Sequence, residues 1–154
     1  MKYLIVLAAL LISPIMAEEA RPLFLPFAVT VGGQKAEMKA DNDLFAVLEK
    51  PIKADATLAL EKPVPMLIIN AFPCKEDGSV EQTAPAAIIF AQNTASTPMN
   101  ATMDKKPLPP GTYLMNIVAN QATARVVFTV EDPAGKTQLP SLDSILKFLK
   151  KKTG

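Results

Sequence analysis

Histidine and tryptophan are absent from this chain of 154 residues, and cysteine occurs only once. The missing histidine removes His-based acid–base catalysis, every Ser–His or Cys–His nucleophile pair, and the imidazole ligands of zinc and copper(II) sites. The single cysteine, Cys74, excludes an intramolecular disulfide. We therefore expect a protein that is not an enzyme. A small hydrolase is the alternative, because folding can bring distant carboxylates together.

Glycine is also scarce, with six residues against 14 prolines. Hydrophobic residues make up 49% of the chain and charged residues 20%, which is enough apolar material for one folded core. Proline lacks an amide donor, so an excess of proline over glycine fits strand ends and loop starts. The composition predicts one folded domain that is not disordered.

The first seventeen residues have the layout of a secretory signal peptide. Lys2 precedes the apolar run Tyr3–Ile12, and the small residue Ala17 stands before the acidic Glu18. This run is shorter than the roughly 20 apolar residues that cross a bilayer, which argues against a membrane anchor. We expect residues 1–17 to be removed on export to the periplasm or the medium of a bacterial cell.

Charge is distributed unevenly along the chain. The net charge is +1, and removal of Lys2 with the signal peptide makes the mature chain neutral. Five lysines and one aspartate follow residue 135, so the C-terminal tail is basic and the preceding body is acidic. Nucleic-acid binding depends on neutralising several phosphates. The neutral total therefore predicts no nucleic-acid partner.

Short apolar runs recur at intervals of about ten residues, separated by Pro, Gly, Asn and Asp. This spacing predicts an antiparallel β-sandwich of about seven or eight short strands over residues 18–135. Gly32-Gly33 fits a hairpin turn, whereas 44–48 fits either a strand or one helical turn capped by Asp43. Leu58 and Leu60 lie in a short run that is followed by Pro63 and Pro65. Residues 66–72 are apolar on both faces and predict a buried central strand, and 86–91 predict another strand. Residues 93–106 predict a long loop, with a short edge strand within it as the alternative.

The clearest hairpin begins after Pro107-Leu108-Pro109-Pro110, which cannot be a central strand. Apolar residues then alternate over 112–120, and the chain returns over 125–131 after a polar turn. The sequence of Pro110-Gly111-Thr112-Tyr113, alternation, turn and return resembles the final hairpin of bacterial immunoglobulin-like β-sandwich modules. The resemblance covers residues 107–131. It implies an immunoglobulin-like fold and carries over no binding residue.

Residues 136–154 predict a basic amphipathic helix. Ser141 is a capping residue, and Leu142, Ile145, Leu146 and Leu149 follow helical spacing. The predicted surface-contact residues are the four lysines of its last turns, Lys147, Lys150, Lys151 and Lys152. The apolar stripe can dock on the sandwich and leave these lysines in solvent. Alternatively, it can bind an anionic membrane surface or a partner protein.

Sulfur-containing side chains suggest the one metal hypothesis. Met99 and Met103 lie in a polar loop, and thioethers together with a thiolate suit Cu(I). Cys74 would complete a site of three sulfur atoms if the fold brought it near. Cys74 alone can instead be a buried thiol, an intermolecular disulfide partner, or a reactive thiol. Pairs of methionines also fill gaps under loops.

Taken together, these features predict an exported, non-enzymatic binding or structural module. It would act through protein–protein or envelope-surface contacts, with a protein partner in the cell envelope. Its contact surface would be a sheet edge, the 92–110 loop or the basic C-terminal helix. The alternative is a periplasmic Cu(I)-binding carrier that uses Met99, Met103 and Cys74.

Overall fold

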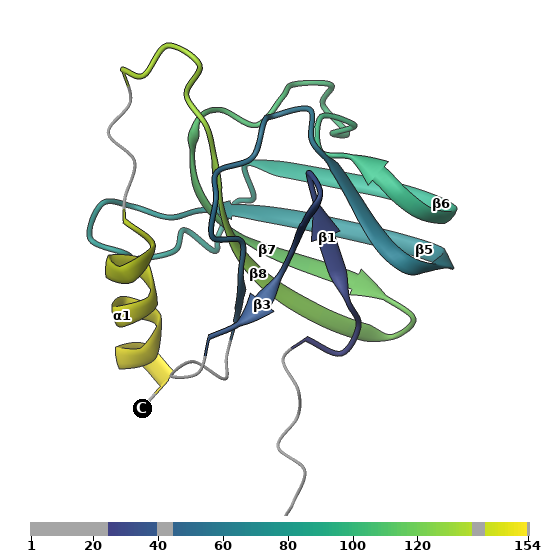
Figure 1. Ribbon diagram of the computed structural model, residues 1–154, viewed down its shortest axis with the longest axis horizontal. Helices are drawn as coiled ribbons and strands as arrows, with labels where there is room; N and C mark the ends of the chain where they lie inside the picture. Colours follow the sequence, from purple (N-terminus) through teal and green to yellow (C-terminus); the bar gives the residue numbers. More distant parts are fainter. Residues whose placement is uncertain (1–24, 40–44, 137–140, 154) are drawn as a thin grey trace, which may run out of the picture.

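The computed structural model describes residues 25–39, 45–136 and 141–153. Among them are eight strands and one helix (Figure 1). The strands are β1 (Val29–Val31), β2 (Gln34–Lys35), β3 (Glu37–Met38), β4 (Ala46–Val47), β5 (Thr57–Pro73), β6 (Ala87–Pro98), β7 (Gly111–Ala119) and β8 (Ala122–Val130). The helix is α1 (Leu142–Thr153). The prediction of a mostly β protein with a C-terminal helix is confirmed.

The strands form one mixed sheet that curls into a nearly closed barrel. The pairing order is β2-β1-β5-β7-β8-β4-β3, with β6 added on β5. β2 and β3 are separated by Ala36 alone, whose N–H donates to Val29 O (2.8 Å). The two ends of this order are therefore neighbours in the chain, which brings the sheet almost back to its start.

This arrangement differs from the expected antiparallel sandwich in two respects. All the described strands lie in one sheet rather than two facing sheets, and β4 pairs with β8 in parallel. The parallel run continues beyond β4, since Leu48 N–H donates to Val127 O (3.0 Å) and Ile52 N–H to Thr129 O (2.8 Å). Parallel pairing needs a long connection, and the chain supplies it between residues 48 and 126.

The inside of the barrel holds the main hydrophobic core. Period-two alternation sends every second side chain of β5, β7 and β8 inward, as in Leu67, Ile69, Ile117, Val126 and Phe128, each at most 1% exposed. The hairpin predicted over 112–131 is confirmed as β7 and β8. The predicted Gly32-Gly33 turn is also confirmed, and both glycines have the positive φ that such a turn requires.

β5 is one strand of 17 residues, whereas the sequence predicted two runs separated by Pro63 and Pro65. Both prolines are exposed. The β5–β6 register shifts between Ala59 and Val64, and Pro63 lies within this irregularity. Pro65 stands outside it, between the paired residues Val64 and Met66. Proline is tolerated at such an irregularity because no amide is needed there. The bend lets β5 pair with β1 near its start and with β7 near its end.

β6 is longer than the sequence predicted. Residues 93–98, expected as part of a long loop, continue the strand and pair with β5. Their polar composition hid the strand, because this stretch lies at the outer margin of the sheet and is largely solvated. The short run 45–48 is extended and contains β4, so the strand alternative is correct for these residues. Residue 44 and the predicted cap Asp43 lie outside the described residues.

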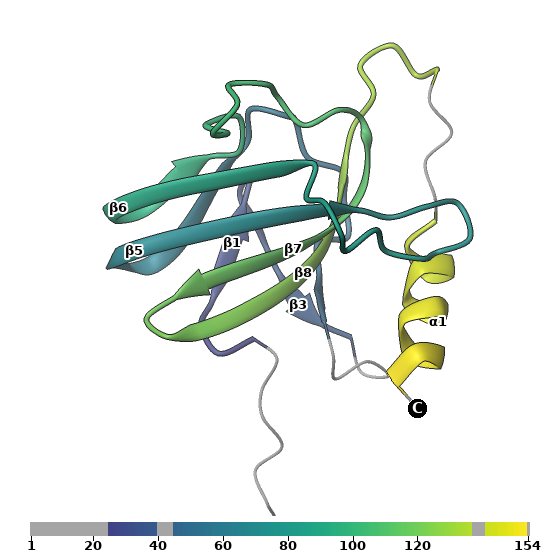
Figure 2. The ribbon, with the colours of Figure 1, turned by 180° about the vertical axis from the view of Figure 1, so that it is seen from behind.

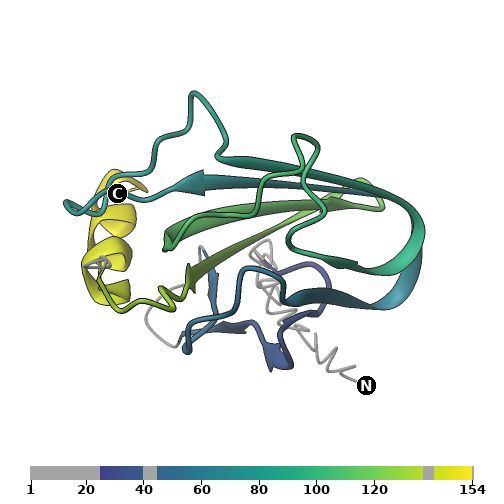
Figure 3. The same cartoon turned by 90° about the horizontal axis from the view of Figure 1, so that it is seen from above.

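Helix α1 packs on the outer side of the barrel (Figure 3). Ser144 N–H donates to Ser141 Oγ (3.2 Å), which is the expected N-cap. Ile145 is fully buried, Leu146 is 7% exposed and Leu142 is half-buried, so these residues of the predicted stripe dock on the sheet. The side chain of Leu149 lies outside the described residues. The second hydrophobic cluster lies beneath the helix and consists of Phe45, Cys74, Leu114, Val127 and Ile145. No described helix is long and apolar enough to cross a membrane.

Candidate interaction face

The outer face of β5, β6 and β7 carries a group of exposed apolar side chains. Among the described residues, the large hydrophobic side chains classed as exposed are Met66 (48%), Ile88 (37%), Phe90 (46%) and Met103 (70%). All four lie on this one face. Single exposed hydrophobic residues are ordinary, but a contiguous group of them marks an interaction site.

The strand register shows why these side chains share a face. Phe90 lies opposite Ile68 in the β5–β6 ladder, and Ile68 lies opposite Val118 in the β5–β7 ladder. Their neighbours Leu67 and Ile69 point into the barrel and are buried. Alternation therefore sends Ile68 and its partners outward. Met66 is two residues from Ile68, and Ile88 is two residues from Phe90. Both side chains therefore point outward as well.

Met103 joins this face from the following loop. Thr102 forms an isolated antiparallel β-bridge with Ile89, and Met103 N–H donates to Ile88 O (2.8 Å). Thr102 and Ile89 are both buried, so Met103 stands beside Ile88 on the opposite, outer side. We call the six residues of this surface the outer apolar face. They are Met66, Ile68, Ile88, Phe90, Met103 and Val118.

Charge is absent from β6, the edge strand of this surface. β6 contains no Asp, Glu, Lys or Arg over its twelve residues. On β5, β6 and β7 the polar side chains on the same side are amides: Gln92 lies opposite Met66, and Asn70 lies opposite both Ile88 and Asn116. On the next strand, β8, Thr123 lies opposite Val118 and Arg125 lies opposite Asn116. Charge-depleted apolar centres bordered by polar side chains are typical of protein–protein contact surfaces.

The predicted sheet-edge contact is restricted by the loop after β6. The carbonyl of Ile88, which points away from β5, already accepts the Met103 N–H bond. An incoming strand cannot use that acceptor without displacing the loop. Asn93 also has a positive φ (49°), which interrupts the regular strand. The face of β6 is therefore more accessible than its edge (Figure 2).

The structure places the three sulfur residues in three different surroundings. Met99 is 1% exposed in the barrel core, Cys74 is 9% exposed in the cluster beneath α1, and Met103 is on the outer apolar face. No group of three His, Cys, Asp or Glu side chains suited to a metal occurs in the described part of the chain. The Cu(I) hypothesis stays a prediction, and the geometry adds no support to it.

Cys74 is a buried thiol in this structure. Burial raises the pKa of its thiol to about 12, while a hydrogen bond with the backbone of Leu114 acts weakly in the opposite direction. A thiol with this pKa is almost entirely protonated at neutral pH, so it is a poor nucleophile and a poor metal ligand. Of the three interpretations of Cys74, the buried thiol agrees with its surroundings.

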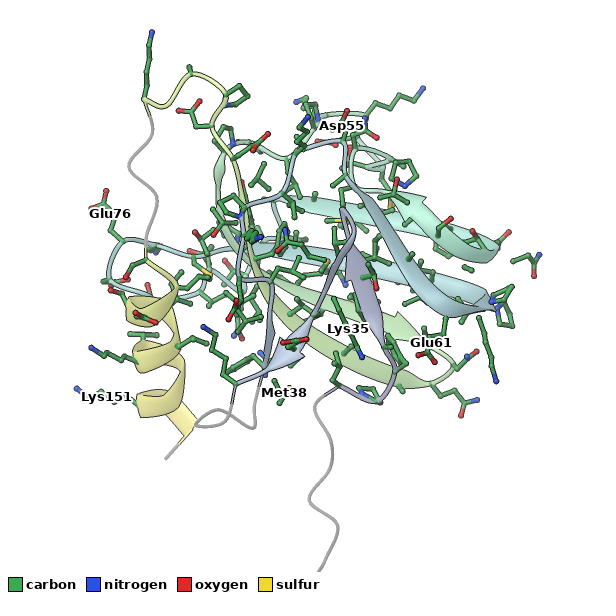
Figure 4. The ribbon with its side chains drawn as sticks, in the orientation of Figure 1. Lys35, Met38, Asp55, Glu61, Glu76 and Lys151 are labelled. Carbon is green, nitrogen blue, oxygen red and sulfur yellow. The ribbon has the colours of Figure 1, made fainter. Side chains whose placement is uncertain are left out.

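Of the four lysines predicted as surface contacts on α1, the structure describes the side chains of two. Lys147 and Lys151 are exposed, and Lys151 points away from the sheet (Figure 4). The side chains of Lys150 and Lys152 lie outside the described residues. Because Ile145 and Leu146 are covered by the barrel, the helix offers charge rather than an apolar stripe to an outside surface. Binding of the helix to an anionic membrane stays a prediction.

Sequence reasoning missed the outer apolar face. Residues 66–72 predicted a central strand buried on both faces, and residues 86–91 predicted a further strand with no indication that one of its faces is exposed. The helix of twelve residues covers only the end of the sheet near Leu114 and Val127. The available signal was this imbalance, namely two strands that are apolar on both faces and one short helix to cover them.

In comparisons with protein-family models, curated proteins and solved structures, no match to this chain was found.

Proposed function

We propose that this protein is a non-enzymatic binding module of the cell envelope that holds a partner protein on its outer apolar face. The observation that carries the proposal is the gathering of Met66, Ile88, Phe90 and Met103 on one surface whose edge strand, β6, contains no charged residue. The proposed partner presents an apolar, uncharged surface bordered by groups that hydrogen-bond to amides. Export through residues 1–17 is part of the same proposal.

Charge favours a protein partner over a lipid surface at this face. Apolar surfaces that bind anionic membranes are normally accompanied by several Lys or Arg side chains on the same side. Here the nearest polar positions in the ladders are Asn70, Gln92, Asn116 and Thr123. The cation Arg125 lies one position beyond Asn116, and its guanidinium is held over the Phe45 ring. Amide side chains supply both donors and acceptors, so they match the mixed polar groups of a protein surface.

Copurification with matched variants tests this proposal. Ile88→Ser/Phe90→Ser makes the face polar, and Ala84→Ser is the control at an exposed position outside it. Tagged full-length protein is purified from the cells that make it, and the recovered proteins are quantified by mass spectrometry. We expect one partner whose recovery falls about tenfold or more with the double variant and is unchanged with the control.

Other occupants of the face would give different results. A dimer of the wild-type chain in sedimentation, lost in the double variant, would assign the face to a second copy and contradict the proposal. Flotation of the purified chain with anionic phospholipid vesicles, again lost in the double variant, would assign it to lipid. Equal recovery of every copurified protein with both variants would also reject it. Thermal unfolding of each variant checks that it is folded.

The finer prediction of an immunoglobulin-like fold belongs to this proposal as well. Tyr113 stands near the start of β7, and its hydroxyl donates to Pro109 O (2.7 Å) four residues upstream. A tyrosine corner of this kind occurs in immunoglobulin-like sandwiches. It supports a relationship of the 107–131 hairpin to those modules, while the single curled sheet distinguishes the whole domain from a regular two-sheet sandwich.

A further inference from the structure

A cavity of about 740 Å³ opens at one end of the barrel, away from the outer apolar face. Three segments line it: residues 53–55 before β5, residues 100 and 107–110 before β7, and Val130 at the end of β8 with Glu131 and Pro133 after it. Figures 1 and 2 show the first two of these segments side by side at the top of the molecule. The volume is within the range of small-molecule sites, which occur in the mouths of β-barrels.

The wall of this cavity is apolar and rigid. Leu108 (2% exposed) and Val130 (1%) contribute from the barrel core, and Pro107, Pro109 and Pro110 surround them. Proline has a fixed φ, so a wall made of prolines loses little conformational freedom when a ligand binds.

Two side-chain hydrogen bonds hold the loop that carries these prolines. Tyr113 Oη donates to Pro109 O (2.7 Å), and Thr102 Oγ1 donates to Lys106 O (2.6 Å). Tyr113 is itself buried and stacks on Phe128, with 5.6 Å between the ring centroids. The loop is thus anchored to the barrel core, and the site is formed before any ligand arrives.

The charged residues that line the cavity are Lys53, Asp55 and Glu131. They make the lining negative by one charge, and Asn100 adds a neutral amide. Asp55 stands at this end of the molecule in Figure 4. The same three charged residues also line a smaller cavity of about 290 Å³ on the other side of the 53–56 turn.

We propose that this cavity binds a small amphipathic organic cation, an amine joined to an aromatic or aliphatic hydrocarbon group. The hydrocarbon packs on Leu108, Val130 and the prolines, and the ammonium group lies toward Asp55 and Glu131. The lining selects against organic anions, because two carboxylates outnumber one lysine. This site is separate from the proposed protein contact and does not depend on it.

Three probes of nearly equal size test the charge preference: phenethylamine, phenethyl alcohol and phenylpropanoate. Binding to the full chain is followed at neutral pH by two-dimensional amide NMR titration. We expect the amine to bind in the millimolar range, with the alcohol weaker and the carboxylate weakest. The amide shifts should fall on residues 53–55, 100, 108, 111, 130 and 131, because the prolines of the wall have no amide proton.

Charge variants decide which groups are responsible. Asp55→Asn/Glu131→Gln should weaken the amine about two- to fivefold per carboxylate, the size expected for a solvent-exposed ion pair, and leave the alcohol unchanged. Lys53→Gln should strengthen the amine by a similar factor. Glu76→Gln, a change at an exposed carboxylate near α1, is the matched control and should alter nothing.

Several outcomes would overturn the proposal. Equal affinity for all three probes, preference for the carboxylate, or shifts that map to the outer apolar face would each do so. No binding at the solubility limit of the amine would also reject the site. All four substituted residues are on the surface or half-buried, so the variants are expected to fold, and their amide spectra show directly whether they do.

Discussion

At the scale of single residues, Cys74 is a neutral thiol enclosed between the sheet and helix α1. Its pKa is raised to about 12 from an ordinary value of 9.0, chiefly because burial disfavours the thiolate. The unfolded chain therefore loses this proton at a lower pH than the folded chain. Below pH 9 the thiol is protonated in both states and adds no pH dependence. Between pH 9 and 12 the free energy of unfolding falls as pH rises.

The pH dependence of this thiol is measurable against a Cys74→Ala variant. From pH 9 to pH 10 the free energy of unfolding of the wild type should fall by about 1 kcal/mol more than that of the variant. Urea unfolding of both proteins at each pH, with reductant present, measures the difference. If the difference in free energy of unfolding between the wild type and the variant stayed constant from pH 8 to pH 10, the account of an enclosed thiol would be contradicted.

At the scale of elements, α1 depends on a close approach to the loop after β5. A Cβ added to Gly78 would lie 2.8 Å from both Ser144 O and Phe148 Cβ. Gly78 also has a φ of +85°, which other residues rarely adopt. The loop is held by Asp77, whose carboxylate accepts bonds from Ser79 N–H (2.9 Å) and Ser79 Oγ (2.6 Å). These bonds lower the pKa of Asp77.

Substitution of Gly78 should loosen the helix without unfolding the barrel. In Gly78→Ala, we expect the labelling of Cys74 by a thiol reagent at pH 8 to become about 10- to 100-fold faster, because an opening of α1 costs less free energy. Gly135→Ala is the control, since Gly135 also has a positive φ (+63°) but open space around it. Similar labelling rates in the two variants would show that the approach of Gly78 to α1 is unimportant.

The elements that the sequence predicted correctly have clean local signals. The alternation of apolar and polar residues over 112–120 and 125–131 predicted β7 and β8, because side chains alternate between the two faces of a strand. Gly32-Gly33 predicted a hairpin turn, because such a turn needs residues that adopt a positive φ. β5 was predicted too short because Pro63 and Pro65 look like strand breaks, and the register shift that contains Pro63 cannot be read from the sequence. β6 was predicted too short because residues 93–98 are mostly polar. The parallel pairing of β4 with β8 depends on contacts between distant segments, and no local pattern encodes it.

The candidate surfaces were the least predictable features. Ile88 and Phe90 have the composition of a buried strand, and only the placement of α1 shows that their face is left uncovered. The cavity at the end of the barrel needs residues from three separate connections, which the sequence does not relate to one another. In contrast, the docking of the C-terminal helix through Ile145 follows from its helical spacing and was one of the two stated alternatives.

At the scale of the whole molecule, the barrel has two surfaces suited to binding. The outer apolar face lies on the sheet, and the cavity lies at one end, where Asn100 and Pro107–Pro110 contribute to its wall. The segment between β6 and β7 supplies residues to both, since Met103 belongs to the outer apolar face. The barrel core below them is continuous and buried, which makes it a rigid support for both surfaces.

The most direct test of the protein contact is site-specific photo-crosslinking in the cells that make the protein. A photoreactive benzoylphenylalanine replaces Phe90 on the outer apolar face, or Glu76 at an exposed control position near α1. We predict a crosslink to one partner protein from position 90, reduced about tenfold or more by adding Met66→Ser and Met103→Ser, and no such product from position 76. The same product with equal yield from both positions, or a product formed only with lipid or a second copy of the chain, would contradict the account.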